Sequence, residues 1–170
     1  MTLPEVLLAL AFAVVLLSVG LPAFAATLTR IRAASIYHSA TTSLASARLA
    51  SLTQGQPVSV CPSADGLHCR VDGIWDEGWI VFLDTNHDGR PHDASAVLQA
   101  SGPLPGEAHF HASSGRRLVR YRPDGSSAGT NVSLRLCMGA RLFGTVIVNN
   151  AGRARTTRET RPPPCPFALD

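Results

Sequence analysis

The sequence predicts an α+β protein in which one long N-terminal helix packs on an antiparallel β-sheet domain. Two observations predict this fold. An apolar run near the N-terminus continues into an Ala-rich stretch, and the rest of the chain alternates short β-type segments with turn residues. The length of 170 residues corresponds to about one domain. A third observation, a marked segregation of charge along the chain, concerns function.

The apolar run spans residues 6–28 and contains no charged residue. As an α-helix rising about 1.5 Å per residue it is about 34 Å long, enough to cross a hydrocarbon core of about 30 Å. A cleaved secretory signal is the alternative, because residues 23–25 (AFA) resemble a cleavage site. Such a signal needs a basic segment before the apolar run, whereas the chain starts with MTLPE. We therefore predict a membrane anchor.

Helical patterning continues through residues 29–54, which are rich in Ala and Ser and contain neither Gly nor Pro. We predict one helix of about 50 residues whose second half is amphipathic and packs on the domain. Pro22 lies inside this helix and should bend it, because proline removes one backbone donor. The chain thus divides into an assembly helix at residues 1–28, its amphipathic continuation at 29–55 and a β-rich head at 56–170.

The head is predicted to contain short strands separated by turn sequences such as DGR, GPLPG and PDG. We predict strands at residues 56–61, 78–84, 96–100, 108–112, 117–122, 131–137 and 141–148. The tail RPPPCPFALD cannot be helical at its prolines, so we expect it to lie over the surface and to be held at Cys165.

The cysteines are Cys61, Cys69, Cys137 and Cys165. A domain held outside the cytoplasm by a membrane anchor lies where disulfides persist. Of the three possible pairings, we prefer 61–69 and 137–165, because these partners are nearest in sequence. Zinc binding is the alternative, but the 61–69 spacing is not the CxxC spacing of common structural zinc sites.

Basic charge is concentrated in the last third of the chain. All 15 basic residues are Arg, and the formal net charge is +3. Residues 1–115 hold five Arg and nine acidic residues, whereas residues 116–161 hold ten Arg and two acidic residues. A basic region beside an acidic one suggests a surface that faces a polyanion.

An acidic residue, Glu5, lies directly beside the apolar run. Placing an acid in a membrane costs about 2.5–3.5 kcal/mol at the helix centre and less near its end. The positive end of the helix dipole compensates part of that cost, and the free α-amino group of a neighbouring chain would compensate more. Glu5 is therefore expected to set the register when such helices bundle. The alternative is an interfacial Glu at the level of the lipid headgroups.

This N-terminus resembles mature type IV pilins and type II secretion pseudopilins, which start close to FTLxEL and carry a proline far along an apolar helix. Thr2, Leu3, Glu5 and Pro22 match that pattern, whereas Met1 replaces the usual Phe. On this resemblance we expect the sequence to begin after prepilin peptidase has removed a short leader.

Four further segments are similar to the GspH/FimT branch of minor pilins. They are GWIVFLDTNHDGRPHD (78–93), RYRPDGSSAG (120–129), SLRLC (133–137) and VIVNNAGRAR (146–155). The resemblance covers nearly the whole chain. It implies a long helix packed against β-sheet, a single-pass anchor in the bacterial inner membrane with the head in the periplasm, and assembly with other pilins at a pilus or pseudopilus tip.

One segment matches the opening of a calcium-binding loop. Asp84, Asn86, Asp88 and Gly89 stand at positions 1, 3, 5 and 6, but position 12, which needs a bidentate Glu, is Ser95. We therefore prefer a polar turn stabilised by side-chain hydrogen bonds.

Two histidines, His109 and His111, share one face of a predicted strand. No acid with matching spacing completes a zinc or catalytic set, so we interpret them as ordinary residues of a half-exposed strand. The chain also lacks a GxSxG nucleophile elbow and a phosphate-binding glycine loop. We expect no enzymatic activity, no cofactor and no metal.

The segment NNAGRARTTR (149–158) is the main candidate site. In an extended chain Arg153 and Arg155 point the same way, about 6.6 Å apart, a spacing that suits neighbouring phosphates. A guanidinium group binds phosphate oxygens through two donors, and Gly152 lets the backbone turn or approach a ligand closely. GRxR also resembles the tail motif of the DNA-binding FimT proteins of natural transformation, which implies DNA contact by Gly152, Arg153 and Arg155. Arg158 and Arg161 extend the charge.

Arg116 and Arg117 are further candidates for the same basic surface, whereas Arg120 and Arg122 alternate and can line a different face. We predict a minor type IV pilin at a pilus tip that binds DNA without sequence preference for uptake in natural transformation. A structural minor pseudopilin of a type II secretion system and a pilus-initiating minor pilin are the alternatives. In both, the arginines only contact other pilins or protect a sheet edge from pairing.

Overall fold

The computed structural model describes residues 2–113, 115–129 and 131–167. A helix, α1 (Leu3–Gln54), precedes the β-structure. The strands are β1 (Val58–Pro62), β2 (Trp79–Leu83), β3 (Val97–Ser101), β4 (Ala108–Ala112), β5 (Val119–Tyr121), β6 (Val132–Met138), β7 (Arg141–Val148) and β8 (Ala154–Arg158), and a short 3-10 helix, η1 (Ala94–Ala96), leads into β3. Each segment predicted as a strand overlaps an observed strand, with the ends agreeing to within about two residues. β8 is not among the predicted strands.

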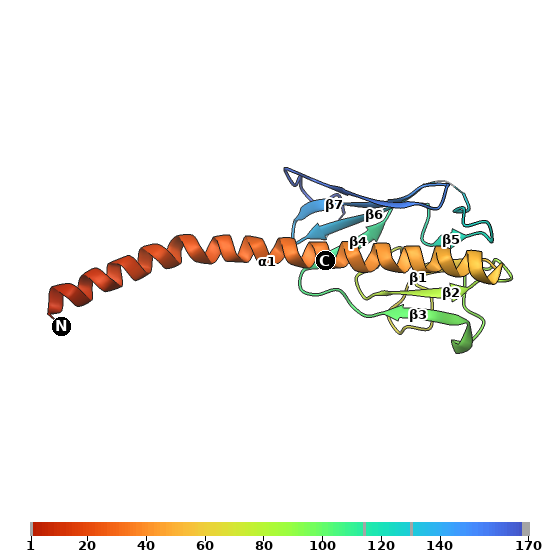
Figure 1. Ribbon diagram of the computed structural model, residues 1–170, viewed down its shortest axis with the longest axis horizontal. Helices are drawn as coiled ribbons and strands as arrows, with labels where there is room; N and C mark the ends of the chain where they lie inside the picture. The colour runs from red at the N-terminus through yellow and green to blue at the C-terminus, as the bar shows by residue number, and fades with distance from the viewer. Residues whose placement is uncertain (1, 114, 130, 168–170) are drawn as a thin grey trace.

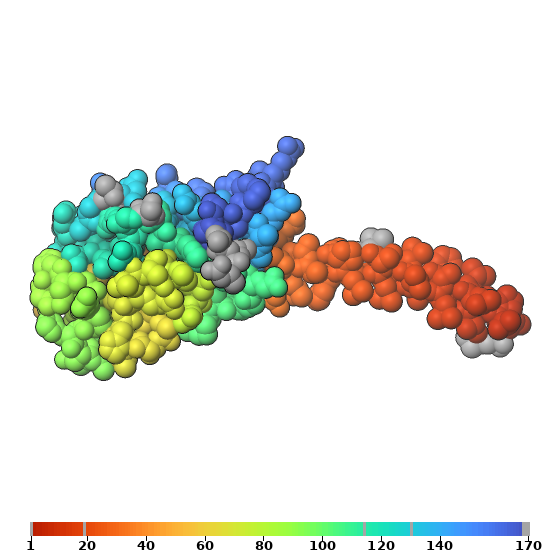
Figure 2. Space-filling view, turned by 180° about the vertical axis from the view of Figure 1, so that it is seen from behind, coloured from red at the N-terminus to blue at the C-terminus, as the bar shows by residue number. Residues whose placement is uncertain are grey.

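The N-terminal half of α1 projects from the head as a stalk (Figures 1 and 2). It is long and apolar enough to cross a membrane, and its apolar side chains are exposed. Pro22 lies inside the helix, and the projecting half is visibly curved (Figure 1). This curvature agrees with the bend expected from a proline that cannot donate its backbone hydrogen bond.

The second half of α1 packs on the head. Its buried positions recur at the three- and four-residue intervals of one helix face, at Ala33, Ile36, Tyr37, Ala40, Ser43, Leu44, Ala47 and Ser51. Small residues stand seven apart in this series and let the helix axis approach the strands. The helix ends at Gly55, whose φ of 63° is the left-handed conformation that closes helices without steric cost.

The strands form two antiparallel sheets, with the orders β3-β2-β1-β5 and β4-β6-β7-β8. In Figure 1, α1 runs across both sheets. An aromatic group, Trp75, Trp79 and Phe110, lies inside the head with ring centroids 6.1–6.3 Å apart. The predicted fold class, a long helix packed on antiparallel sheet, is confirmed.

Both preferred disulfides are present. Cys61 pairs with Cys69, and Cys137 on β6 pairs with Cys165 in the tail. The tail is also held by backbone contacts, because Leu142 N–H donates to Pro163 O and Cys165 N–H donates to Ala140 O, both at 2.9 Å. The tail therefore lies along the start of β7, as expected for a segment attached at Cys165.

Candidate nucleic-acid interface

The arginine segment forms the edge of a sheet. β8 pairs with β7 in antiparallel register, from Val148 opposite Ala154 to Gly144 opposite Arg158. Only Ala154 contributes to the core, and the rest of β8 is exposed. The strand was missed by sequence patterning because its Arg and Thr side chains are exposed on both faces and show no apolar alternation.

Gly152 makes the turn into β8. Its φ is 76°, and its N–H donates to Asn149 O at 2.9 Å. An added Cβ atom would lie 2.1 Å from Gly125 O, which also accepts a hydrogen bond from Arg48 Nε at 2.9 Å. Gly152 therefore lacks a side chain because its backbone passes close to the backbone of Gly125. Gly152 shapes the segment that carries the arginines.

The arginines of this segment do not all point the same way. Arg155 lies opposite Ile147, on the face of the sheet turned away from α1, whereas Arg158 lies opposite Gly144, on the face turned toward α1. Arg158 therefore does not share the face of Arg155, because the two are an odd number of positions apart in the strand. Arg153 precedes the strand and is held at its backbone, where its N–H donates to Asn149 Oδ1 at 3.0 Å.

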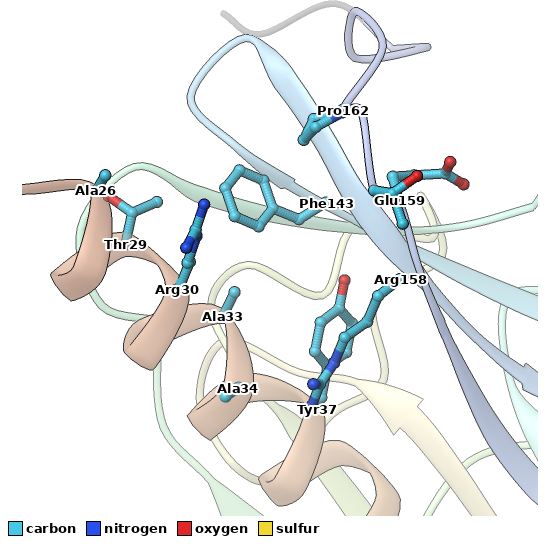
Figure 3. Close-up of a pocket in the computed structure, with 11 residues that line it drawn as sticks. Ala26, Thr29, Arg30, Ala33, Ala34, Tyr37, Phe143, Arg158, Glu159 and Pro162 are labelled. Carbon is cyan, nitrogen blue, oxygen red and sulfur yellow. The ribbon is translucent and has the colours of Figure 1, made fainter. Parts of the chain in front are cut away.

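Arg158 lines a recess of about 440 Å³ between α1 and the β7–β8 edge. Figure 3 shows its side chain running alongside Tyr37, with Arg30 and Phe143 nearby and Glu159 directed away. Burial raises the pKa of the Tyr37 hydroxyl, and the positive charge of Arg158 is a smaller, opposing cause. Arg158 is therefore partly engaged with the helix side of the head.

The side chains of Arg153, Arg155, Arg158 and Arg161 are all exposed. Among the residues that the structure describes, none of the four forms an ion pair with an acidic group. After β8 the chain projects from the head near the point where the stalk leaves it (Figures 1 and 2). The β8 edge of the sheet therefore carries unneutralised positive charge along its length.

Arg116 and Arg117 lie in the connection that precedes β5. They line a recess of about 470 Å³ with Arg120, in the connection between β4 and β5. Burial lowers the pKa of Arg116, and repulsion from Arg120 is the smaller cause. The residues that line this recess include none of the β8 arginines.

The calcium-like segment is a polar turn, as predicted. Asp84 is fully buried and accepts hydrogen bonds from Ser59 Oγ at 2.6 Å, Gly89 N–H at 3.0 Å and Arg120 Nε at 2.6 Å. Its carboxylate closes the turn and anchors Arg120 on the outer face of the β1–β5 pair.

His109 and His111 do have an acidic neighbour. Asp76 Oδ2 lies 2.8 Å from His109 Nδ1 and 3.6 Å from His111 Nε2. Spacing along the sequence does not reveal this acid, because Asp76 lies 33 residues upstream of His109.

Glu5 has a local partner that the sequence analysis did not anticipate. Its Oε2 accepts from Thr2 N–H at 2.7 Å and from the Thr2 hydroxyl at 3.1 Å. These bonds satisfy one side of the carboxylate at the start of the helix. Met1, expected to take part in assembly with Glu5, lies outside the described residues.

Comparison with known proteins provides one family and one fold. A family model described as "Type II transport protein GspH" matches residues 38–152. The matched range ends just before Arg153. No protein of curated function matches the chain.

Two crystal structures of the type IV minor pilin FimU of Pseudomonas aeruginosa (strain PAO1) have a similar fold. The crystal in space group P21 gives a TM-score of 0.64 at 15% identity, covering 79% of this chain and 94% of FimU. The crystal in space group P65 gives 0.59 at 15% identity, covering 76% and 95%. At this identity the similarity concerns the fold alone.

Proposed function

The chain belongs to the GspH family, and from that membership we propose that it is a minor pilin of a type IV pilus that binds DNA without sequence preference. The observation that carries the proposal is the group of four exposed arginines on and around β8: Arg153, Arg155, Arg158 and Arg161. Positive charge that its own head leaves unneutralised favours an anionic partner.

Phosphate contact is the chemistry these side chains suit best. Arg binds phosphate oxygens through paired donors, and such contacts position DNA without reading its sequence. The backbone around them is restrained by β7 pairing, by the Gly152 turn and by the 137–165 disulfide. Restraint before binding lowers the entropy lost on binding. Arg153 and Arg155 are proposed as the principal contacts, with Arg158 and Arg161 beside them.

In this proposal, the apolar half of α1 determines where the arginine surface is presented. The apolar half of α1 anchors the chain in the bacterial inner membrane, with the head in the periplasm, after prepilin peptidase processing. The same helix then bundles with other pilins, with Glu5 setting the register, so that the head is carried to a pilus tip. DNA captured there would enter the uptake pathway of natural transformation.

The test is DNA titration of the full-length chain in detergent micelles at several salt concentrations. Three or four phosphate contacts give a log–log salt slope of about −3 to −4, and Arg153→Gln with Arg155→Gln should reduce its magnitude by about 2. The loss should be equal for unrelated DNA sequences, because phosphates are common to all of them.

The matched control is Arg32→Gln with Arg90→Gln, which removes the same charge from exposed positions away from β8. A second double variant, Arg116→Gln with Arg117→Gln, reports whether the separate recess contributes. If the β8 variant keeps wild-type affinity and salt slope while its melting temperature is unchanged, the DNA-binding proposal is refuted.

The second candidate is a structural minor pseudopilin of a type II secretion system. It is favoured by the description of the matching family as a type II transport protein. The matched residues, 38–152, also end before the four arginines on and around β8. Deleting the gene should then reduce protein secretion and leave transformation unchanged. The opposite pattern supports DNA uptake.

A further inference from the structure

Three side chains of metal-binding type meet on the sheet away from the β8 edge. Asp76, His109 and His111 each direct one ligand atom toward the others, and these atoms all lie within 4.8 Å of one another. The three side chains are 19–27% exposed, so the cluster is partly buried and still reached by solvent.

Strand pairing produces this arrangement. Ile74 forms an antiparallel bridge opposite His111, and the same register places Asp76 opposite His109. Trp75 N–H donates to Phe110 O at 2.8 Å, and Ala112 N–H donates to Gly73 O at 2.9 Å, which holds the segment along β4. Alternation then puts all three side chains on the same face.

Neighbouring groups orient two of the three ligands. Asp76 Oδ1 accepts a hydrogen bond from Phe110 N–H at 2.6 Å, which leaves Oδ2 directed at the histidines. The His111 ring stacks on Phe167, with centroids 3.9 Å apart and an interplanar angle of 13°. Phe167 lies two residues after Cys165, so the 137–165 disulfide keeps this ring in place. Outer groups of this kind orient ligands in metal sites.

We propose that Asp76 Oδ2, His109 Nδ1 and His111 Nε2 bind one divalent transition-metal ion of the zinc class. Imidazole nitrogens with one carboxylate suit such ions, whereas Mg²⁺ and Ca²⁺ prefer oxygen ligands. Bond lengths of about 2.0–2.1 Å in a tetrahedron place ligand atoms about 3.3 Å apart. The distances of 2.8 and 3.6 Å from Asp76 Oδ2 reach that value by shifts of about half an ångström.

The site has three protein ligands and an open side, so water completes the coordination. The ion joins three parts of the head: the segment before β2, strand β4 and, through the His111–Phe167 stack, the C-terminal tail. Metal binding therefore stabilises the folded head and the tail together. This role is independent of DNA binding, because none of the β8 arginines takes part.

The experiment is a titration of the full-length, disulfide-intact chain in detergent micelles, after chelator treatment, with ZnCl₂ by calorimetry and with CoCl₂ by visible absorption. We expect one ion per chain, cobalt ligand-field bands and a higher melting temperature with zinc. His109→Gln and His111→Gln should each weaken binding by at least about tenfold, and the double variant should abolish it.

The matched control is His68→Gln. His68 also contacts an acid, with Nδ1 2.6 Å from Asp65 Oδ2, but it belongs to a pair without a second histidine. It should leave zinc affinity unchanged.

Binding retained by the double histidine variant, or the lack of stoichiometric binding by the wild type, would overturn the proposal. Zinc-edge X-ray absorption of the wild type tests it without any substitution: scattering from two imidazole rings supports the site, and an all-oxygen shell overturns it.

Discussion

At residue 152 the backbone has a positive φ and passes close to Gly125. The left-handed conformation and the close contact each disfavour a side chain at this position. Gly152→Ala should destabilise the head by about 1–3 kcal/mol, because both the left-handed conformation and the contact with Gly125 O become unfavourable. Chemical denaturation followed by circular dichroism measures this loss.

Gly66→Ala separates the two causes. Gly66 has nearly the same φ, 75°, but its added Cβ would meet only Ala100 Cβ at 3.6 Å, an ordinary contact. It should therefore cost only the conformational part, about 1 kcal/mol. Equal losses at both positions would show that the Gly125 contact contributes nothing.

For residues 153–158, the sequence predicts the charge of the segment but not the direction of each side chain. Their positive charge is visible in the sequence, and so is the need for glycine before them. The direction of each arginine is decided by register with β7, which puts Arg155 and Arg158 on opposite faces. β8 was not predicted as a strand, so its register with β7 came only from the structure.

At the scale of an element, α1 changes its surroundings along its length. The side chains described in the projecting half are exposed, whereas Leu44 is 1% exposed between the helix and the sheets. Leu44→Ala should destabilise the head by about 2–5 kcal/mol, because it removes buried methyl groups and leaves a cavity. Denaturant unfolding measures this loss as a lower midpoint concentration, with the dependence of the unfolding free energy on denaturant unchanged.

Leu49→Ala is the control on the same helix. Leu49 is 61% exposed, so the change should remain within about 0.5 kcal/mol of wild type. Similar losses for the two variants would mean that α1 does not dock on the sheets as described.

At the scale of the whole molecule, the two disulfides close loops of different length, with sequence separations of 8 and 28. The chain-entropy relation gives about 2.6 kcal/mol for the 61–69 loop and about 3.6 kcal/mol for the 137–165 loop. Replacing both cysteines of a pair by Ser should therefore cost more for the second pair in thermal or chemical unfolding.

Loss of the 137–165 bond should also release the tail, which limited proteolysis of the folded protein detects. The 61–69 variant serves as the comparison, since its disulfide does not touch the tail. A tail equally protected in both variants would contradict this anchoring role, and with it the support that Phe167 gives to His111.

The sequence by itself determined the features that depend on neighbouring residues. Apolar length and composition specify a membrane-sized helix, three- and four-residue spacing specifies which helix face packs, and turn residues between β-type segments specify most strands. The disulfide partners were those nearest in sequence. Local conformational preference and burial of one face suffice for all of these features.

Only the tertiary structure decided the arrangements that join distant segments. It placed Asp76 beside His109, brought Gly125 against Gly152, and placed Phe167 on His111. These contacts depend on sheet order and register across tens of residues, because strand pairing is made by backbone groups that are the same at nearly every position.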